Sequence, residues 1–229
     1  GCTVQVVVAN SGTAAATGTV VLDLNDADSG LTDSSGDPGP PLLAFVKGPV
    51  WDRAEEETAH AFAELAAELG DRVVEVELPE TAQRALDWHG CIMAAEMAAN
   101  LDREWELGRD RLSERLRAHL TRGREVSALD YQKARARIPL LIEGFAEIFE
   151  RFDAIVTPSA PGTAPKGLGA TGDPSFCTLW TLLGTPAISL PLMRGGSGLP
   201  MGVQLVGPRH GDARLLRTAR WLARQMAQG

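Results

Sequence analysis

The chain has 229 residues, of which 44% are hydrophobic and 23% are charged, so it can form one sizeable core or one domain with an appendage. A formal net charge of −8 argues against nucleic-acid and anionic-membrane partners, because both require a cationic protein surface. The cysteines, Cys2, Cys91 and Cys177, lack C-x-x-C spacing, which signals neither a disulfide framework nor a zinc site. We therefore expect a cytoplasmic protein that uses no metal or cofactor.

The beginning of the chain differs in composition from the rest. No lysine or arginine occurs before Lys47, while aspartate, glycine, serine and threonine are abundant. Two β-branched runs, at 4–8 and 19–24, predict a hairpin, and the Gly/Pro-rich stretch at 34–41 predicts a linker. The composition change divides the chain into an acidic first segment and a main region, residues 1–40 and 41–229.

The main region opens with alternating strand and helix signals. Residues 42–46 form a short apolar run, and Asp52 with Glu55 resembles the capping pair of a helix that Gly70 ends. Residues 72–78 alternate valine or leucine with glutamate, as strands do. A strand, helix and strand of this length predict a parallel pair with a right-handed crossover.

Helical patterns dominate the middle of the chain. The charged stretch at 81–123 is predicted to be helical with a break near Gly108. Ser127 opens a further predicted helix that runs to Phe149 and is kinked by Pro139.

Strands return near the C-terminus. A helix is predicted to begin at Asp173 and Pro174 and to end at Gly184, and Asp212 is predicted to cap a terminal amphipathic helix. The predicted fold class is α/β, a mixed sheet flanked by helices. Its last three strands are expected at 152–158, 187–190 and 202–207.

Three linked segments carry a family resemblance. They are FDAIVTPSAPGTAPKG, TGDPSFCTLWTLLGTPAISLPL and GLPMGVQLVGPRHGDARLLRTARWLA, in this order. Together they resemble the C-terminal portion of the amidase signature family, and the match extends from about Pro41 to the end. The resemblance implies hydrolysis of amide carbon–nitrogen bonds by a serine nucleophile, a second serine in cis conformation and a lysine base, all on the part N-terminal to the matched region.

The residues that this chemistry needs are not found. Ser11–Gly12 and the turn at 195–198 lack the Gly/Ser-rich surroundings of the signature, and none of Lys47, Lys133 and Lys166 matches the catalytic lysine. No catalytic residue is therefore assigned. Because the chain also begins with Gly1, we expect a truncated, inactive chain that self-associates or needs a missing N-terminal half.

The resemblance places four residues at the substrate: Asp173, Phe176, Cys177 and Trp180. Asp173 can instead cap its helix, Cys177 can be a small packing residue, and Trp180 fits a core position as well as a substrate contact. The missing half would normally cover part of the core surface, so its absence predicts a partly exposed Trp180. The scattered histidines, His60, His89, His119 and His210, predict no metal site.

Three functions follow from these observations. The chain is the C-terminal part of an amidase, inactive alone; or it is a non-catalytic small-molecule-binding or subunit module derived from one; or it is a thiol enzyme that uses Cys177. The absence of a Ser/Lys pair favours the first hypothesis over the second. The third ranks last because no histidine is placed by the sequence to serve Cys177.

Overall fold

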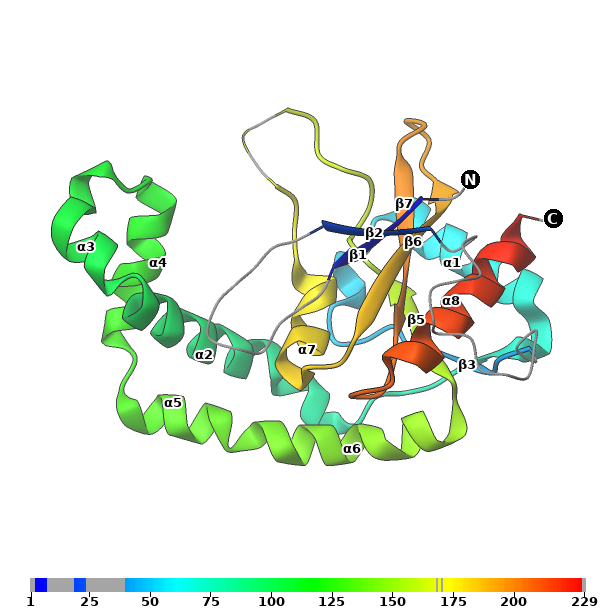
Figure 1. Cartoon of the computed structure of the whole chain (residues 1–229), viewed down its shortest axis with the longest axis horizontal. Helices are drawn as coiled ribbons and strands as arrows, with labels where there is room; N and C mark the ends of the chain where they lie inside the picture. Colours follow the sequence, from blue (N-terminus) through cyan, green and yellow to red (C-terminus); the bar gives the residue numbers. More distant parts are fainter. Residues whose placement is uncertain (1–2, 8–18, 24–39, 168, 170, 228–229) are drawn as a thin grey trace.

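The computed structural model describes residues 3–7, 19–23, 40–167, 169 and 171–227. The described strands form one seven-stranded sheet in the order β2-β1-β6-β7-β5-β3-β4 (Figure 1). β3 is parallel to β4 and β5, while the other pairs are antiparallel, which confirms the predicted mixed sheet. The strands are β1 Thr3–Val7, β2 Thr19–Asp23, β3 Leu43–Phe45, β4 Val73–Glu75, β5 Ala154–Pro158, β6 Ala187–Arg194 and β7 Pro200–Val206.

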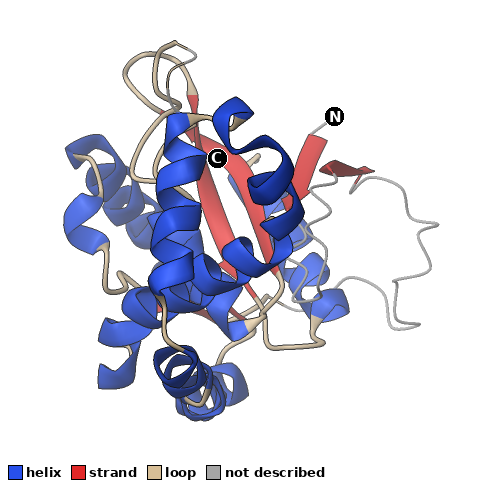
Figure 2. Ribbon diagram, turned by 90° about the vertical axis from the view of Figure 1, so that its left-hand side faces the viewer, coloured by secondary structure: helices blue, strands red, loops and turns tan. Residues whose placement is uncertain are grey.

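Helices lie on both sides of this sheet (Figure 2). They are α1 Glu56–Leu69, α2 Ala85–Asn100, α3 Asp102–Gly108, α4 Glu114–Glu125, α5 Ala128–Arg135, α6 Arg137–Arg151, α7 Ser175–Leu183 and α8 Asp212–Met226. Short 3-10 turns occur at η1 Trp51–Arg53, η2 Gly70–Arg72, η3 Glu80–Arg84 and η4 Arg109–Arg111.

The central strands β3 and β5 are buried on both faces, and their alternate side chains point to opposite sides of the sheet. In β3, Leu43 and Phe45 join a cluster that includes α1 and α8, whereas Ala44 joins a cluster that includes α6 and α7. The same alternation separates Val156 from Ile155 in β5. This central part of the sheet therefore lies between two apolar cores, as predicted for strands almost free of charge.

The predicted hairpin is present. β1 and β2 pair antiparallel, and β1 also meets β6 through Gln5 and Ser189. Most of the predicted linker at 34–41 lies outside the described residues, so its prediction stays open.

Several helix boundaries follow local signals. Gly70 ends α1 and Gly184 ends α7, each with a positive φ that a glycine adopts without a steric penalty. α3 ends at Gly108, as predicted. The helix predicted from Ser127 to Phe149 is divided at Ala136, three residues before Pro139, whose missing N–H leaves the carbonyl four residues earlier without a helical donor.

Two predicted caps are wrong. Asp52 lies in the 3-10 turn η1, and the extended backbone of Ala54 separates it from α1, whose N-cap Glu55 makes no side-chain capping bond. Asp212 is the first residue of α8 rather than its N-cap, which is Gly211. There its carboxylate adds negative charge to the first turn, where it interacts favourably with the helix dipole. The strand predicted at 72–78 is also shorter, since β4 pairs only with the three residues of β3.

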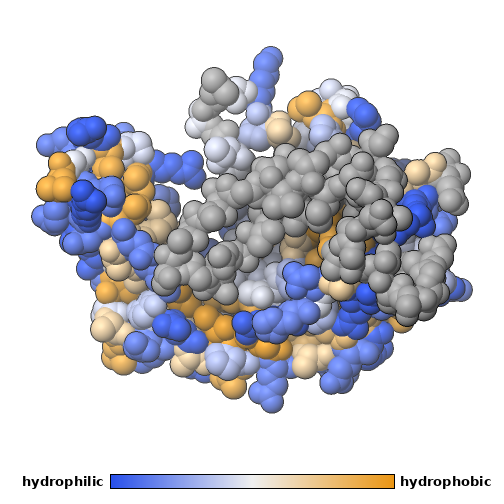
Figure 3. Space-filling view, in the orientation of Figure 1, coloured by the Kyte–Doolittle hydropathy of each residue, from blue (hydrophilic) through white to orange (hydrophobic). Residues whose placement is uncertain are grey.

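Helices α2 to α5 form a helical extension of the molecule, which in Figure 1 reaches furthest from the sheet at α3 and α4. α2 and α4 pack closely because Gly123 has no side chain, and a Cβ there would overlap the Ala94 carbonyl. Trp105 stacks with Arg109 and Arg124, whose guanidinium carbons lie 4.5 and 5.0 Å from its ring centre. Three leucines on α3, α5 and α6 are exposed: Leu107, Leu129 and Leu140. Figure 3 shows apolar areas among polar ones on this side of the molecule.

Candidate functional site

One face of the sheet changes from apolar to polar between neighbouring rows of paired residues. Ile155, Val206 and Ala187 lie side by side across β5, β7 and β6, and they belong to or pack against the core under α6 and α7. Two residues further along each strand, the paired residues are Thr157, Gln204 and Ser189, which we call the polar row. Because residues two apart share a face, the polar row continues the same side of the sheet.

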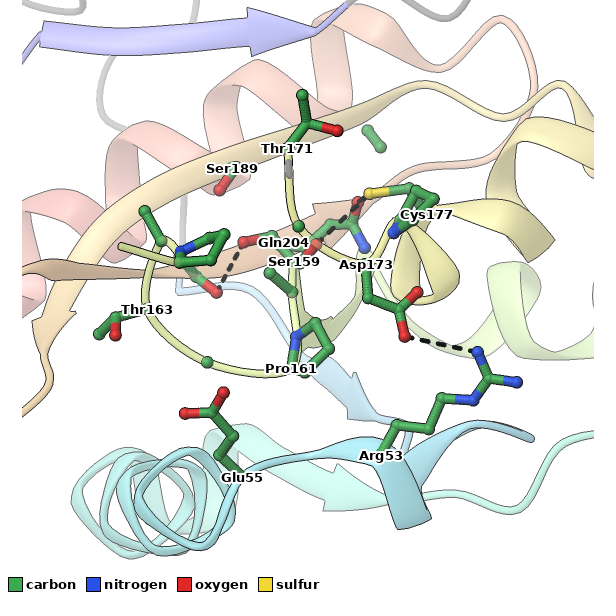
Figure 4. Close-up of a pocket in the computed structure, with 18 of the residues that line it drawn as sticks. Arg53, Glu55, Ser159, Pro161, Thr163, Thr171, Asp173, Cys177, Ser189 and Gln204 are labelled. Atoms are coloured by element: carbon green, nitrogen blue, oxygen red, sulfur yellow. Dashed lines mark hydrogen bonds and ion pairs between the residues drawn. The ribbon is translucent and has the colours of Figure 1, made fainter. Parts of the chain in front are cut away.

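A cavity of about 1220 Å³ lies beside the polar row (Figure 4). Ser189 and Gln204 line it from the sheet, the segment 159–165 forms one wall, and the start of α7 forms the opposite wall. Arg115 is the one lining residue from helices α2 to α6. Three of the four predicted substrate-binding residues, Asp173, Cys177 and Trp180, line this cavity, together with Arg53 and Glu55.

Gly202 lines the cavity where it meets the sheet and allows two serine side chains to approach the backbone closely. The Ser159 hydroxyl donates a hydrogen bond of 3.1 Å to the Gly202 carbonyl. A Cβ on Gly202 would overlap the hydroxyls of both Ser159 and Ser189. Only glycine therefore fits at this position without movement of the two serines.

Gln204 is almost entirely buried, with 4% of its surface exposed, and uses both ends of its carboxamide. Its Nε2 donates to the carbonyls of Pro158 at 3.3 Å and Phe176 at 3.2 Å. Its Oε1 accepts from the Cys177 thiol at 3.6 Å. These partners offset the cost of burying a polar side chain in a strand.

Asp173 sits at the N-terminal end of α7 and makes two polar contacts. Its Oδ1 accepts a hydrogen bond of 2.9 Å from the Ser175 N–H at the start of α7, and its Oδ2 lies 3.4 Å from Nη1 of Arg53. The N-cap of α7 is Pro174, so Asp173 lies one residue before the cap rather than at it. Partial burial raises the pKa of this carboxyl, but hydrogen bonds from Ser175 and the Arg53 guanidinium outweigh it and lower the pKa overall. Asp173 is therefore a carboxylate at neutral pH.

The environment of Cys177 disfavours a thiolate. Burial raises the pKa of its thiol, which also lies 3.4 Å from the Ser159 carbonyl as a hydrogen-bond donor. No histidine lines the cavity in the described part of the chain. Both observations count against the thiol-enzyme hypothesis.

The aromatic residues of α7 differ from expectation. Trp180 is 4% exposed, so the prediction of a partly exposed indole is wrong. The ring of Phe145 on α6 packs edge-to-face against it at 5.9 Å, so α6 covers part of the indole. Phe176 is buried and does not line the cavity, although its carbonyl accepts from Gln204.

None of the lysines lines the cavity. Lys47 pairs with Glu75 at 2.6 Å, while Lys133 and Lys166 are exposed. Among the residues that the structure describes, no group of three or more His, Cys, Asp or Glu side chains could hold a metal ion. Over the same residues, no helix is both long and apolar enough to cross a membrane.

The fold is that of an α/β protein with a cavity beside a mixed sheet. A family model described as Amidase matches residues 16–216. The chain therefore belongs to the amidase family. The match begins within the first 40 residues, and the predicted division at residue 40 stays a prediction.

Individual relatives agree with this assignment. Fatty acid amide hydrolase of Medicago truncatula is 33% identical over 163 residues, which cover 66% of this chain and 27% of the relative. The 2-amino-5-chloromuconic acid deaminase of Comamonas testosteroni is 28% identical over 194 residues, which cover 78% of this chain and 42% of the relative.

Solved structures share the fold. A crystal structure of an amidase has a TM-score of 0.74 at 22% identity and covers 82% of this chain and 46% of its own. A 6-aminohexanoate cyclic dimer hydrolase complexed with substrate has a TM-score of 0.67 at 22% identity, covering 86% of this chain and 47% of its own. The chain thus spans between about a quarter and a half of the length of these relatives.

The sequence did not identify several residues of the cavity. Gln204 could have been identified from the sequence, because a single amide side chain in an otherwise apolar strand is uncommon without a specific hydrogen-bond partner. Ser159 follows a buried strand directly, where loops often carry function. Arg115 gave no signal, since it is one of many arginines on a charged helix. The remaining unpredicted lining residues used above are Arg53, Glu55, Ser189 and Gly202.

Proposed function

We propose that this chain supplies the substrate-binding wall of an amidase that hydrolyses amide carbon–nitrogen bonds, and that it is inactive alone. The observation that carries the proposal is the cavity beside the polar row, in a chain of the amidase family. Binding is assigned to Asp173, Cys177 and Trp180 from the cavity walls and to Ser159 and Ser189 near the sheet. Phe176 is not retained as a direct contact because it lies outside the cavity lining.

The chemistry of the cavity floor fits a neutral amide. An amide group presents a carbonyl acceptor and, unless fully substituted, an N–H donor, and a serine hydroxyl can serve either. Ser159 uses its proton on the Gly202 carbonyl and keeps its oxygen as an acceptor, and Ser189 faces the same space. The floor carries no charge, so a neutral amide can bind there without leaving a buried charge unpaired.

Catalysis would require residues that the cavity lacks. Amidases of this type are expected to use a serine activated by a lysine base, and no lysine lines the cavity. The proposed partner is therefore a polypeptide segment that carries the serine nucleophile and the lysine. We place the protein in the cytoplasm, which the free thiols of Cys91 and Cys177 support.

A binding experiment with the purified 229-residue chain tests this proposal. We expect saturable binding of a small aryl amide such as benzamide, measured by ligand-observed NMR, and hydrolysis no faster than in a blank without protein. Cys177→Met should weaken binding because a longer side chain enters the cavity, whereas Cys91→Met on α2, outside the cavity, should not. Absence of binding to the folded chain would contradict the proposed wall.

A non-catalytic binding or subunit module is the second candidate function. The cavity supports it, since its walls and floor come from described residues of this chain alone. The two candidates separate when the chain is mixed with a polypeptide that carries the family's serine and lysine. Restored hydrolysis supports the amidase wall, and unchanged binding without hydrolysis supports the module. Turnover by the chain alone that disappears in Cys177→Ser would instead revive the thiol hypothesis.

Self-association remains part of the proposal for the isolated chain, because an edge strand that lacks its partner can pair with a second copy. Sedimentation velocity at tens of micromolar tests it. A single monomeric species would contradict self-association without affecting the proposed wall.

A further inference from the structure

We infer that Gln204 is the positioning residue of the cavity: its carboxamide holds the first turn of α7 against the C-terminal end of β5 and so sets the separation of the two walls. This inference deepens the proposed function and rests on it for the identity of the ligand. The geometry that carries it does not depend on any ligand.

The position of Gln204 lets one side chain reach both walls. β7 lies between β5 and β6, and Gln204 is paired with Thr157 on one side and Ser189 on the other. Pro158 ends β5, directly before the wall segment 159–165. From Gln204, Nε2 donates to the Pro158 carbonyl at 3.3 Å and to the Phe176 carbonyl, in the first turn of α7, at 3.2 Å.

Few other hydrogen bonds join the two walls. In the described part of the chain, the one direct bond between them runs from the Cys177 thiol to the Ser159 carbonyl at 3.4 Å. The same thiol lies 3.6 Å from Oε1 of Gln204, and Figure 4 shows Ser159, Cys177 and Gln204 grouped together. Gln204 thus hydrogen-bonds to Pro158, Phe176 and Cys177, and the remaining bond at this junction runs from Cys177 to the Ser159 carbonyl.

Loss of the carboxamide should change the cavity more than the fold. Gln204→Met keeps the length and approximate shape of the side chain but removes both donors and the acceptor. The carbonyls of Pro158 and Phe176 then lose a buried partner, and water must enter between the walls to solvate them. Cys177 lies at this junction, so its thiol should become more accessible to solvent and lose one of its two hydrogen-bond acceptors, with the Ser159 carbonyl remaining.

The reactivity of Cys177 measures this change without a ligand. In a chain with Cys2→Ser and Cys91→Ser, we expect iodoacetamide at neutral pH to alkylate Cys177 roughly tenfold faster when Gln204→Met is added, the effect of about one lost hydrogen bond. Leu205→Ala is the matched control. It changes the next residue of β7, on the opposite face, and should destabilise the protein while leaving the alkylation rate of the folded state within about twofold of its parent.

A native-state measurement covers the case in which Gln204→Met does not fold. In the unmodified protein, the side-chain Nε2 protons of Gln204 should exchange with solvent at least about tenfold more slowly than those of exposed Gln132, because both carbonyl contacts protect them. Equal exchange of the two glutamines would overturn the inference. So would an unchanged alkylation rate in a folded Gln204→Met chain, even if benzamide binding is intact. Failure of benzamide binding with both readouts as expected would overturn the proposed function alone.

Discussion

The two faces of β7 show how one strand serves a core and a site. On the face toward α1 and α8, Val203 and Leu205 are fully buried in apolar surroundings. On the opposite face, Val206 belongs to the second core, while Gln204 and Gly202 lie at the cavity. The apolar face stabilises the sheet through the burial of its side chains. On the other face, part of the apolar surface is replaced by a polar side chain that makes hydrogen bonds. The site therefore begins where one face of β7 stops contributing to a core.

The largest effect is expected on the apolar face. Leu205→Ala removes a fully buried side chain and leaves a cavity between the sheet and the helices, which should lower the free energy of unfolding by about 2–5 kcal/mol. Urea denaturation measures this change. Gln204→Met should cost less, since it leaves apolar burial nearly unchanged. A larger loss for Gln204→Met than for Leu205→Ala would break the proposed division between the faces.

A smaller effect is expected where the cavity meets the sheet. Gly202→Val places a branched side chain into the hydroxyls of Ser159 and Ser189, so overpacking should cost about 1–3 kcal/mol and should abolish benzamide binding. Gly108→Ala is the control, because its Cβ would meet no atom within 4 Å. Thermal unfolding and ligand-observed NMR measure the two quantities. Normal binding by Gly202→Val would show that the serines do not need this close approach.

The smallest effect is expected at the rim of the cavity. The folded-state pKa of Asp173 is lowered, so its carboxylate contributes stability at pH values above the unfolded pKa, and this contribution disappears as the pH falls through the folded pKa. Its side chain is 41% exposed, so solvent screening should keep the difference between the wild-type chain and Asp173→Asn below about 1 kcal/mol at pH 7.

Urea denaturation from pH 7 into the acid range, with both proteins side by side, measures this contribution. The stability difference should diminish once the carboxyl of the wild-type chain is protonated. A difference that grows in acid would contradict the assigned direction of the pKa shift.

Much of the fold could be predicted because its signals are local. Gly70 and Gly184 ended helices where predicted, and the parallel pairing of β3 with β4 followed from the strand–helix–strand pattern. The capping predictions at Asp52 and Asp212 were wrong because a residue type favoured at a cap also fits a 3-10 turn or a first helical position. Sequence spacing does not distinguish these backbone conformations.

The candidate site could be predicted only in part. Asp173, Cys177 and Trp180 lie on one continuous segment, so recognising that segment identified them together. Ser189 and Gln204 reach the cavity through the register of β6 and β7, which no local pattern specifies. The exposure of Trp180 was predicted wrongly because its cover comes from α6, a helix whose position relative to α7 the sequence did not indicate.

The register that creates the polar row also links accurate folding to the presence of a cavity. A slip of β7 by one residue would turn Leu205 toward the cavity and Gln204 into the core beneath α1 and α8, since neighbouring side chains point to opposite faces. The buried carboxamide would then lose its hydrogen-bond partners, so such a misfolded form would be destabilised on both sides of the sheet at once.

The pairing of β5 with β3 joins segments 111 residues apart, as the contact of Leu42 with Asp153 illustrates. Such a distant pairing forms slowly relative to a helix. We therefore expect the cavity to form late in folding, in the same step in which β7 adopts its native register.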